Sequence, residues 1–436
     1  MSHQTPPGRA GAQRAPQSRR DPHGWPHAFV AVLAALVAMA VVAALGLWAA
    51  GAGDLPGGAF PAVVAAVVVM AVGGSVGLSG GAGGFAETDA GLSVVPLSVT
   101  LVGALVIAAG FLRPLRHRAV ADTKELVGWA ARIALLWVLL LVGLALVASH
   151  RFTIKLGEGT AADIGDLLGA SPKVGFETDV PPTLVFGLLW LAGVFAMALL
   201  VSRGAPLPAR LVRFQESVRP AAHAMLVLLL AYVVLGLLVG LVVAATRGHA
   251  AETLAVLLLG LPNLLWLAFT LGLGVSWEGR VDGPFGLPMP RVLDQVLRKP
   301  TDSTLNLRTL SEHDDGVWWL LVVAAVMVLG AAFLTAARSP ARMRAWQHAV
   351  HMAVALALTV LTVCLLAEIS AHAGLSLLGI GDLGGGLSGL VKLRPHLGTA
   401  LVIAVAWGLV AGFVGGLLAR PVHRRGEVGR KSADER

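Results

Sequence analysis

The chain has 436 residues, of which 56% are hydrophobic and 13% are charged, and its mean hydropathy is +0.78. A soluble domain of this size carries about 25% charged residues, because even a compact fold needs a polar surface. The composition therefore excludes a soluble globular protein and predicts an integral membrane protein. The formal net charge of +8 is concentrated in short clusters between apolar runs, a pattern that reports membrane orientation and does not indicate nucleic-acid binding.

The two ends of the sequence are polar. Residues 1–26 are rich in Pro, Arg and Gln, residues 420–436 are basic, and we expect both to be disordered cytoplasmic tails. The apolar run at 27–50 is too long for a signal-peptide core and long enough to span a membrane. We therefore expect it to be an uncleaved first helix.

Ten apolar segments follow one another along the chain. Each has about 17–27 residues, which suits a helix that crosses a hydrocarbon core of roughly 30 Å. Inside lipid, backbone amides must be satisfied within their own segment, so the predicted fold class is all-α, a polytopic transmembrane helical bundle of eight to ten membrane segments. The segments are 27–50, 59–78, 96–112, 126–149, 182–202, 220–246, 252–275, 317–336, 349–368 and 397–419.

Arg-rich clusters divide these segments into groups of three, two, three and two. Lys and Arg in short loops favour the cytoplasm, so we expect the clusters and both termini on the cytoplasmic side. The clusters lie at 9–20, 113–118, 203–219, 338–344 and 420–431.

A group of three segments cannot begin and end on the same side if all three cross. We expect the non-crossing members to be 59–78, which Pro and Gly interrupt, and 252–275, which carries Pro262 and Asn263 in its middle. In the alternative arrangement all ten segments cross and two Arg clusters lie outside.

An internal duplication is also predicted. Trp190 precedes Arg203 by the same interval of thirteen residues as Trp407 precedes Arg420. The sequence Ile-Gly-Asp-Leu precedes each of these helices, at 164–167 and at 380–383. We expect two parallel membrane halves of five apolar segments each, 27–218 and 219–419, a pattern known in transporters.

The best polar feature in the middle of a segment is Asn263, which follows Pro262. Pro frees a backbone carbonyl one turn earlier, and an Asn side chain bonds to backbone or to a neighbouring helix. This pattern occurs at a solute site in a broken helix, but it is more typical of a kinked structural helix.

Asp166 and Asp382 come from the two Ile-Gly-Asp-Leu copies. Matched acids in a pseudo-symmetric protein can bind a cation or relay a proton, whereas the alternative interpretation is that each caps a short helix or turn. His313, Asp314 and Asp315 offer metal-ligand chemistry, but they also fit a solvated lead-in to the helix at 317–336.

No catalytic cluster, nucleotide-binding loop or metal-binding helix occurs in the sequence. We therefore expect no enzymatic activity, no cofactor and no resident metal. Lone Cys364 lies in an apolar run and fits a small core residue.

The composition, together with three short motifs, resembles the streptophobe family of very hydrophobic actinobacterial membrane proteins. The resemblance implies a multi-pass protein of a bacterial plasma membrane whose function is unknown, and it carries no site residues. The motifs are Gly77-Leu78-Ser79-Gly80-Gly81-Ala82-Gly83-Gly84-Phe85, Phe111-Leu112-Arg113-Pro114-Leu115-Arg116 and Ser276-Trp277-Glu278-Gly279-Arg280.

Three functions remain open at the level of sequence. The first is a non-enzymatic membrane component whose partner is the lipid bilayer. The second is a transporter or channel for a small or apolar solute, which the duplication and the two interrupted segments favour. The third and weakest is a membrane-embedded enzyme.

Overall fold

The computed structural model describes most of the chain. The described residues are 24–55, 58–82, 86–117, 123–153, 173–202, 209–282, 291–298, 301–339, 343–377, 380–382 and 389–420.

The described residues form a bundle in which eight helices are long and apolar enough to cross a membrane. This confirms the predicted helical membrane bundle, because hydrophobic runs of this length satisfy their backbone groups only as helices. The eight are α1 (Trp25–Ala49), α4 (Thr123–Val147), α6 (Val180–Val201), α7 (Ala209–Thr246), α8 (Ala250–Leu273), α11 (Trp319–Arg338), α12 (Ala345–Ala367) and α13 (Leu397–Leu418). The shorter helical elements are α2 (Phe60–Ala71), α3 (Leu97–Leu112), α9 (Arg291–Leu297), α10 (Leu307–Ser311), η1 (Ala52–Asp54), η3 (Pro114–His117) and η4 (Asp315–Trp318).

The two segments that were expected to be interrupted behave differently. In 59–78, α2 ends after 12 residues, about 18 Å, at a turn where Gly73 has a φ of 94°. In 252–275, by contrast, α8 continues through Pro262 for 24 residues. The second segment is therefore a continuous helix and not a broken one, and whether it crosses the membrane stays a prediction.

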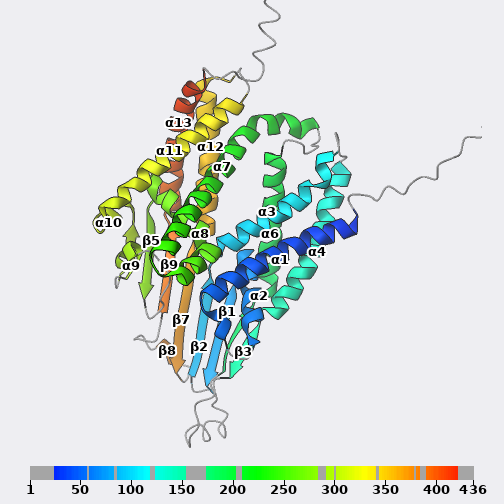
Figure 1. Ribbon diagram of the computed structural model, residues 1–436, viewed down its shortest axis with the longest axis vertical. Helices are drawn as coiled ribbons and strands as arrows, with labels where there is room; N and C mark the ends of the chain where they lie inside the picture. The colour runs from blue at the N-terminus through cyan, green and yellow to red at the C-terminus, as the bar shows by residue number, and fades with distance from the viewer. Residues whose placement is uncertain are drawn as a thin grey trace, which may run out of the picture.

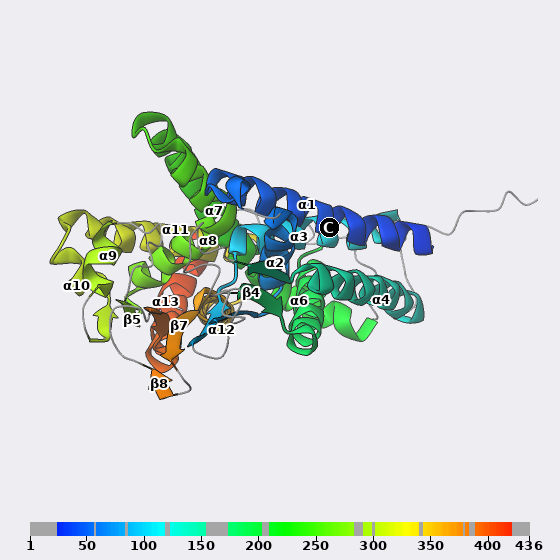
Figure 2. The ribbon, with the colours of Figure 1, turned by 90° about the horizontal axis from the view of Figure 1, so that it is seen from below.

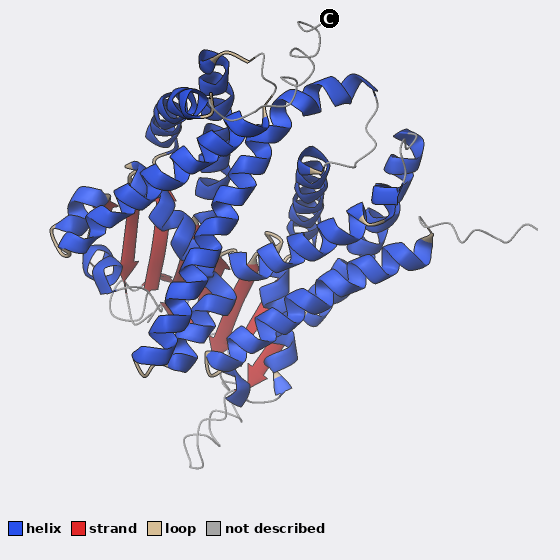
Figure 3. Cartoon of the chain, turned by 45° about the horizontal axis from the view of Figure 1, so that its top comes forward, coloured by secondary structure: helices blue, strands red, loops and turns tan. Residues whose placement is uncertain are grey.

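A nine-stranded antiparallel sheet, which the sequence analysis did not foresee, accompanies the helices. Figure 1 shows the strands side by side in the lower part of the molecule, and Figure 3 shows the helices crossing in front of them. The strands are β1 (Val76–Ala82), β2 (Ala86–Ser93), β3 (His150–Thr153), β4 (Lys173–Thr178), β5 (Trp277–Asp282), β6 (Ser303–Leu305), β7 (Ile369–Leu377), β8 (Ile380–Asp382) and β9 (Gly389–Pro395).

The order of the strands repeats. Along the sheet it is β3-β4-β1-β2-β7-β9-β5-β6, with β8 added to β7. Each half of the chain contributes two helices, two strands, two helices, two strands and a last helix, with α9, α10 and β8 as additions in the second half. By this correspondence β7, β9, β5 and β6 match β3, β4, β1 and β2, so both halves build the same four-strand unit. This supports the predicted parallel duplication.

Each half also has its own hydrophobic core. One core extends from Ala28 to Ala198 and the other from Ala224 to Ala411. A small third cluster joins Leu97 of α3, Trp266 of α8 and Val363 of α12, and it links the two halves.

The sheet meets the helices at one set of helix ends. Strands follow α2, α4, α8 and α12 almost directly, and strands precede α3, α6 and α13. In Figure 1 the opposite ends of α11, α12 and α13 lie at the top, away from the strands. Those opposite ends carry the Arg clusters that follow α11 and α13.

Candidate functional site

Helix α8 is the central helix between the two halves. It packs against α1 and α3 of the first half and against α7 and α11 of the second. In the most apolar stretch of 18 residues in α8, 50% is buried, which is the largest share among the eight candidate spans of the described residues. The polar residue that the sequence singled out in its middle therefore lies where the two halves meet.

The side chain of Asn263 is bonded on both of its polar atoms. Its Oδ1 accepts from the N–H of Leu97 at 3.0 Å, and its Nδ2 donates to the carbonyl of Val95 at 2.8 Å. Leu97 is the first residue of α3, whose own N-cap position, Pro96, gives no side-chain bond. Asn263 thus supplies, from the other half of the chain, a partner that a helix N-terminus ordinarily takes from its own cap.

Ser98 strengthens this contact. Its hydroxyl donates to the carbonyl of Leu257 at 2.9 Å and accepts from the N–H of Leu261 at 3.2 Å. These two backbone groups stand four residues apart in α8, so the hydroxyl bridges one turn of the helix just before Pro262. We call Asn263 and Ser98, with the backbone groups that they bond, the α3–α8 clasp.

A second hydroxyl fixes the same turn of α3 within the first half. Thr100 donates to the carbonyl of Ala71, at the end of α2, at 2.6 Å. Pro262 itself is buried in the continuous helix α8. The polar groups around the Pro262 position thus bond to backbone, an arrangement that fits a structural role for this motif.

The structure describes only one residue of the second predicted pair. Asp166 lies outside the described residues. Asp382 is the last residue of β8, where it pairs with Ser376 of β7. The hypothesis of two acids at a common axis stays a prediction.

The motif at 313–315 forms the lead-in to α11. The Asp314 side chain accepts from the N–H of Gly316 at 2.8 Å and caps η4, while Nδ1 of His313 lies 3.0 Å from the carbonyl oxygen of Thr309. Among the described residues, no group of three His, Cys, Asp or Glu side chains is placed to hold a metal ion.

Buried polar side chains in the described part of the helices are mostly hydroxyls, and they bond to nearby backbone. Thr335, for example, donates to the carbonyl of Ala331 at 2.9 Å, and Ser339 donates to that of Thr335 at 2.7 Å. The hydroxyl of Tyr232 differs, because it is buried beside Phe269 without a hydrogen-bond partner in the described structure. Buried Asp, Glu, Lys or Arg is absent from the residues that the structure describes.

The charged residues of β5 and β9 lie on one face of the sheet. Along β5, Trp277, Gly279 and Val281 are buried, and the residues between them, Glu278, Arg280 and Asp282, occupy the other face. Their register places Glu278 opposite Arg394 and Arg280 opposite Lys392 of β9. Like charges directly across a sheet repel each other, so the facing Arg280 and Lys392 each need a carboxylate of their own.

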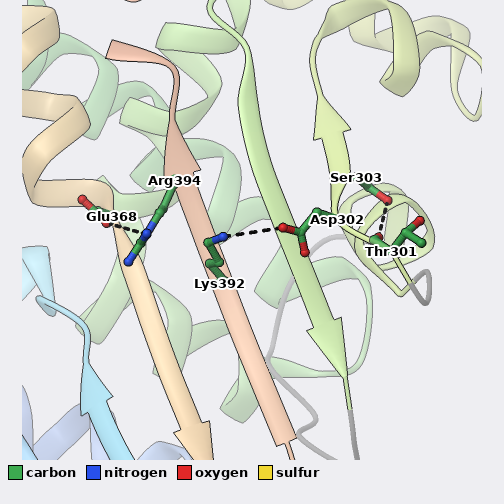
Figure 4. Close-up of polar contacts among 6 residues, drawn as sticks. All are labelled: Thr301, Asp302, Ser303, Glu368, Lys392 and Arg394. Atoms are coloured by element: carbon green, nitrogen blue, oxygen red, sulfur yellow. Dashed lines mark hydrogen bonds and ion pairs between the residues drawn. The ribbon is translucent and has the colours of Figure 1, made fainter.

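Those carboxylates are present (Figure 4). Glu368, at the end of α12, lies 3.1 Å from Nε of Arg394, and Asp302 reaches across β5 to Nζ of Lys392 at 3.5 Å. Arg280 forms an ion pair with Asp282. Arg280, Lys392 and Arg394 are thus each paired with a carboxylate. This face therefore presents no uncompensated positive charge from β5 and β9.

Sequence reasoning found Asn263 but missed the rest of the clasp. Ser98 gave no signal, because a lone Ser in an apolar run is common in membrane helices. The charged face was missed together with the strands that carry it. The alternation of polar and apolar residues over Trp277–Asp282 was the available signal for β5.

Comparison of the chain with protein-family models, with curated proteins and with solved structures finds no match.

Proposed function

We propose that the chain is a non-enzymatic component of a bacterial plasma membrane that holds a polar β-sheet on the outer surface. The observation that carries this proposal is the α3–α8 clasp. The polar groups most suited to a solute path are bonded to backbone across the joint between the halves. The resemblance to the streptophobe family agrees with such a component and stays a prediction.

The orientation rests on two sets of residues. The Arg clusters favour a cytoplasmic location for the helix ends that lie away from the sheet, and for both termini. Exposed Trp residues are typical of the two membrane interfaces. Trp25 and Trp48 stand at the two ends of α1, about 35 Å apart along the helix, while Trp319 begins α11 near the sheet. The sheet then lies outside the cell.

In this orientation α2 and α8 do not cross the membrane. Both α1 and α7 begin in the cytoplasm and cross to the outside. The next helix, α2 or α8, then leads to a strand of the sheet, which also lies outside. A helix that both begins and ends outside must re-enter or lie along the interface. Because α8 is long enough to cross, connectivity and not length decides this assignment.

The alternative function is a transporter or channel for a small or apolar solute. The parallel halves favour it, because transporters with such repeats move one half against the other. A membrane-embedded enzyme is the weakest alternative. A transport cycle requires the clasp to open and water to reach α8 between the halves.

Thiol labelling distinguishes these functions. In a Cys364→Ala background, Leu261→Cys reports on α8 beside the clasp, Ser93→Cys on the sheet side and Arg344→Cys on the opposite side. For a static component in intact cells, an impermeant reagent labels Ser93→Cys but neither of the other two. A small permeant reagent then labels Arg344→Cys but not Leu261→Cys. Aqueous labelling of Leu261→Cys in a folded protein contradicts the static component and favours a transporter, and labelling of Arg344→Cys from outside contradicts the orientation.

A further inference from the structure

The two halves of the sheet are joined head to tail. The last strand of the first unit, β2, pairs with the first strand of the second unit, β7, over the eight residues Ala86–Ser93. This joint is heterologous, because it unites two different edges. An interface of this kind does not close by itself and can continue from one copy to the next.

The outer edges of the sheet repeat the two edges of this joint. By the correspondence of the halves, the outer edge of β6 matches that of β2, and the outer edge of β3 matches that of β7. Since both halves have the same direction through the membrane, a second copy placed by the same step stays in the same membrane. Its β3 would add to β6.

The β6 end differs from β2 in length. β6 has only three residues, Ser303–Leu305, where β2 has eight. The chain turns into α10 immediately after it. The side chain of Asn306 accepts from the N–H of Thr309 at 2.9 Å, and the hydroxyl of Thr309 accepts from the N–H of Asn306 at 3.0 Å. This reciprocal capping box stops the strand and starts the helix.

The same capping box also covers the edge of the strand. The Thr309 hydroxyl donates to the carbonyl of Thr304 at 3.0 Å and shares its proton with the carbonyl of Asn306 at 3.1 Å. Thr304 is the middle residue of β6, and because its carbonyl already accepts a bond from α10 it is a poorer acceptor for an incoming strand. Leu305 and Leu310 are buried on either side of the box and hold it in place.

We infer that the Asn306–Thr309 capping box and the shortened β6 form an end cap that stops head-to-tail growth of the sheet, and that the partner it excludes is a second copy of this chain. Short and covered edge strands are the usual protection against edge-to-edge association. Internal β2 has no such cap, and its edge is paired with β7.

The test removes the cap and lengthens the edge. In the full-length double variant Asn306→Val/Thr309→Val both capping side chains are lost. The segment from Ser303 to Leu310 then gains Val at 306 and 309, and β-branched residues favour a strand. The purified protein is reconstituted in lipid nanodiscs large enough for several copies, and its mass is measured over a range of concentrations during assembly. The wild type keeps one mass, whereas the ratio of dimer to monomer for the variant rises in proportion to the concentration of free monomer.

A proline at the edge supplies the matched control. The N–H of Thr304 points the same way as its bonded carbonyl, away from β5, so Thr304→Pro removes only an outward donor. Added to the double variant, it restores the wild-type mass. A folded double variant that keeps one mass at every concentration overturns the inference, and so does a wild type that already forms the same series.

A second variant covers the case in which the double variant does not fold. Thr309→Val alone frees the Thr304 carbonyl, and its control is Ser311→Val, whose lost hydroxyl bonds the carbonyl of Arg308 away from β6. The dimer fraction of Thr309→Val exceeds that of Ser311→Val if the cap acts as inferred. Equal dimer fractions for the two variants overturn it.

Discussion

At the scale of single residues, Asn263 shows how one amide joins two halves of a membrane protein. Asn263→Leu leaves the N–H of Leu97 and the carbonyl of Val95 without this partner in a partly buried place. We expect a loss of about 1–3 kcal/mol in the free energy of unfolding, since unsatisfied groups in a helix interface are costly. Thermal unfolding in detergent checks this. Thr362→Val is the control, because that hydroxyl bonds only within α12 and should leave the melting temperature unchanged.

Because Asn263→Leu is expected to destabilise the protein, its effect on transport needs a stability measurement beside it. A loss of transport alone would not identify a solute site, because the substitution also weakens the joint between the halves. A melting temperature equal to that of the wild type contradicts the clasp and makes the side chain available for a solute.

Tyr232 gives a prediction of opposite sign. Its hydroxyl is buried beside Phe269 without a hydrogen bond in the described structure. Tyr232→Phe removes an unsatisfied polar group and leaves the ring in place. We expect the free energy of unfolding to stay the same or to rise by up to about 1 kcal/mol in the same melting experiment. A clear decrease would show that the hydroxyl has a partner, such as a bound water or solute.

At the scale of elements, the pair α12–α13 packs through glycine. A Cβ added at Gly412 would lie 2.7 Å from the carbonyl oxygen of His348 and 2.8 Å from the Cα of Ala349. Small residues let the two backbones approach in this way, and helix association in membranes depends on such packing. Gly412→Val therefore separates the helices, and we expect a loss of about 1–3 kcal/mol in the free energy of unfolding from overpacking.

Gly398, at the start of α13, is the matched control for this substitution. A Cβ there meets nothing within 4 Å, so Gly398→Ala should stabilise the helix slightly. Both variants are compared by thermal unfolding and by the yield of monodisperse protein. Equal behaviour of Gly412→Val and the wild type would show that α12 and α13 are not packed so closely.

The elements also show why only part of the fold followed from the sequence. Lipid leaves the backbone little choice but helix, so long apolar runs such as Trp25–Ala49 were predictable. The strand Val76–Ala82 is mostly Gly, Ser and Ala, and because Gly and Ala are depleted in strands its composition does not predict one. The sheet that contains this strand also depends on pairing between the two halves of the chain, such as that of Ala86–Ser93 with Ile369–Leu377. Local sequence patterns do not encode such distant pairing.

At the scale of the whole molecule, the candidate site lies at the joint between the two duplicated halves. The clasp was half visible in the sequence, because Asn263 after Pro262 marked a special place in α8, but its partners Val95 and Leu97 are backbone groups without a sequence signal. The same joint continues into the sheet as the pairing of β2 with β7. Helix α8 and this strand pair therefore hold together two units that each have their own core.

Two separately cored units with a large mutual interface should assemble without the peptide bond between them. Expressed together in one membrane as residues 1–205 and 206–436, the two pieces should copurify through a tag on either one, because the strand pairing and the packing of α8 on α1 and α3 remain. The double change Asn263→Leu/Ser98→Ala removes the clasp and should lower the recovered partner severalfold, whereas Thr362→Val should not. Pieces that insert stably but never copurify would show that the halves need their covalent link, and the joint between them would then be too weak for a static component.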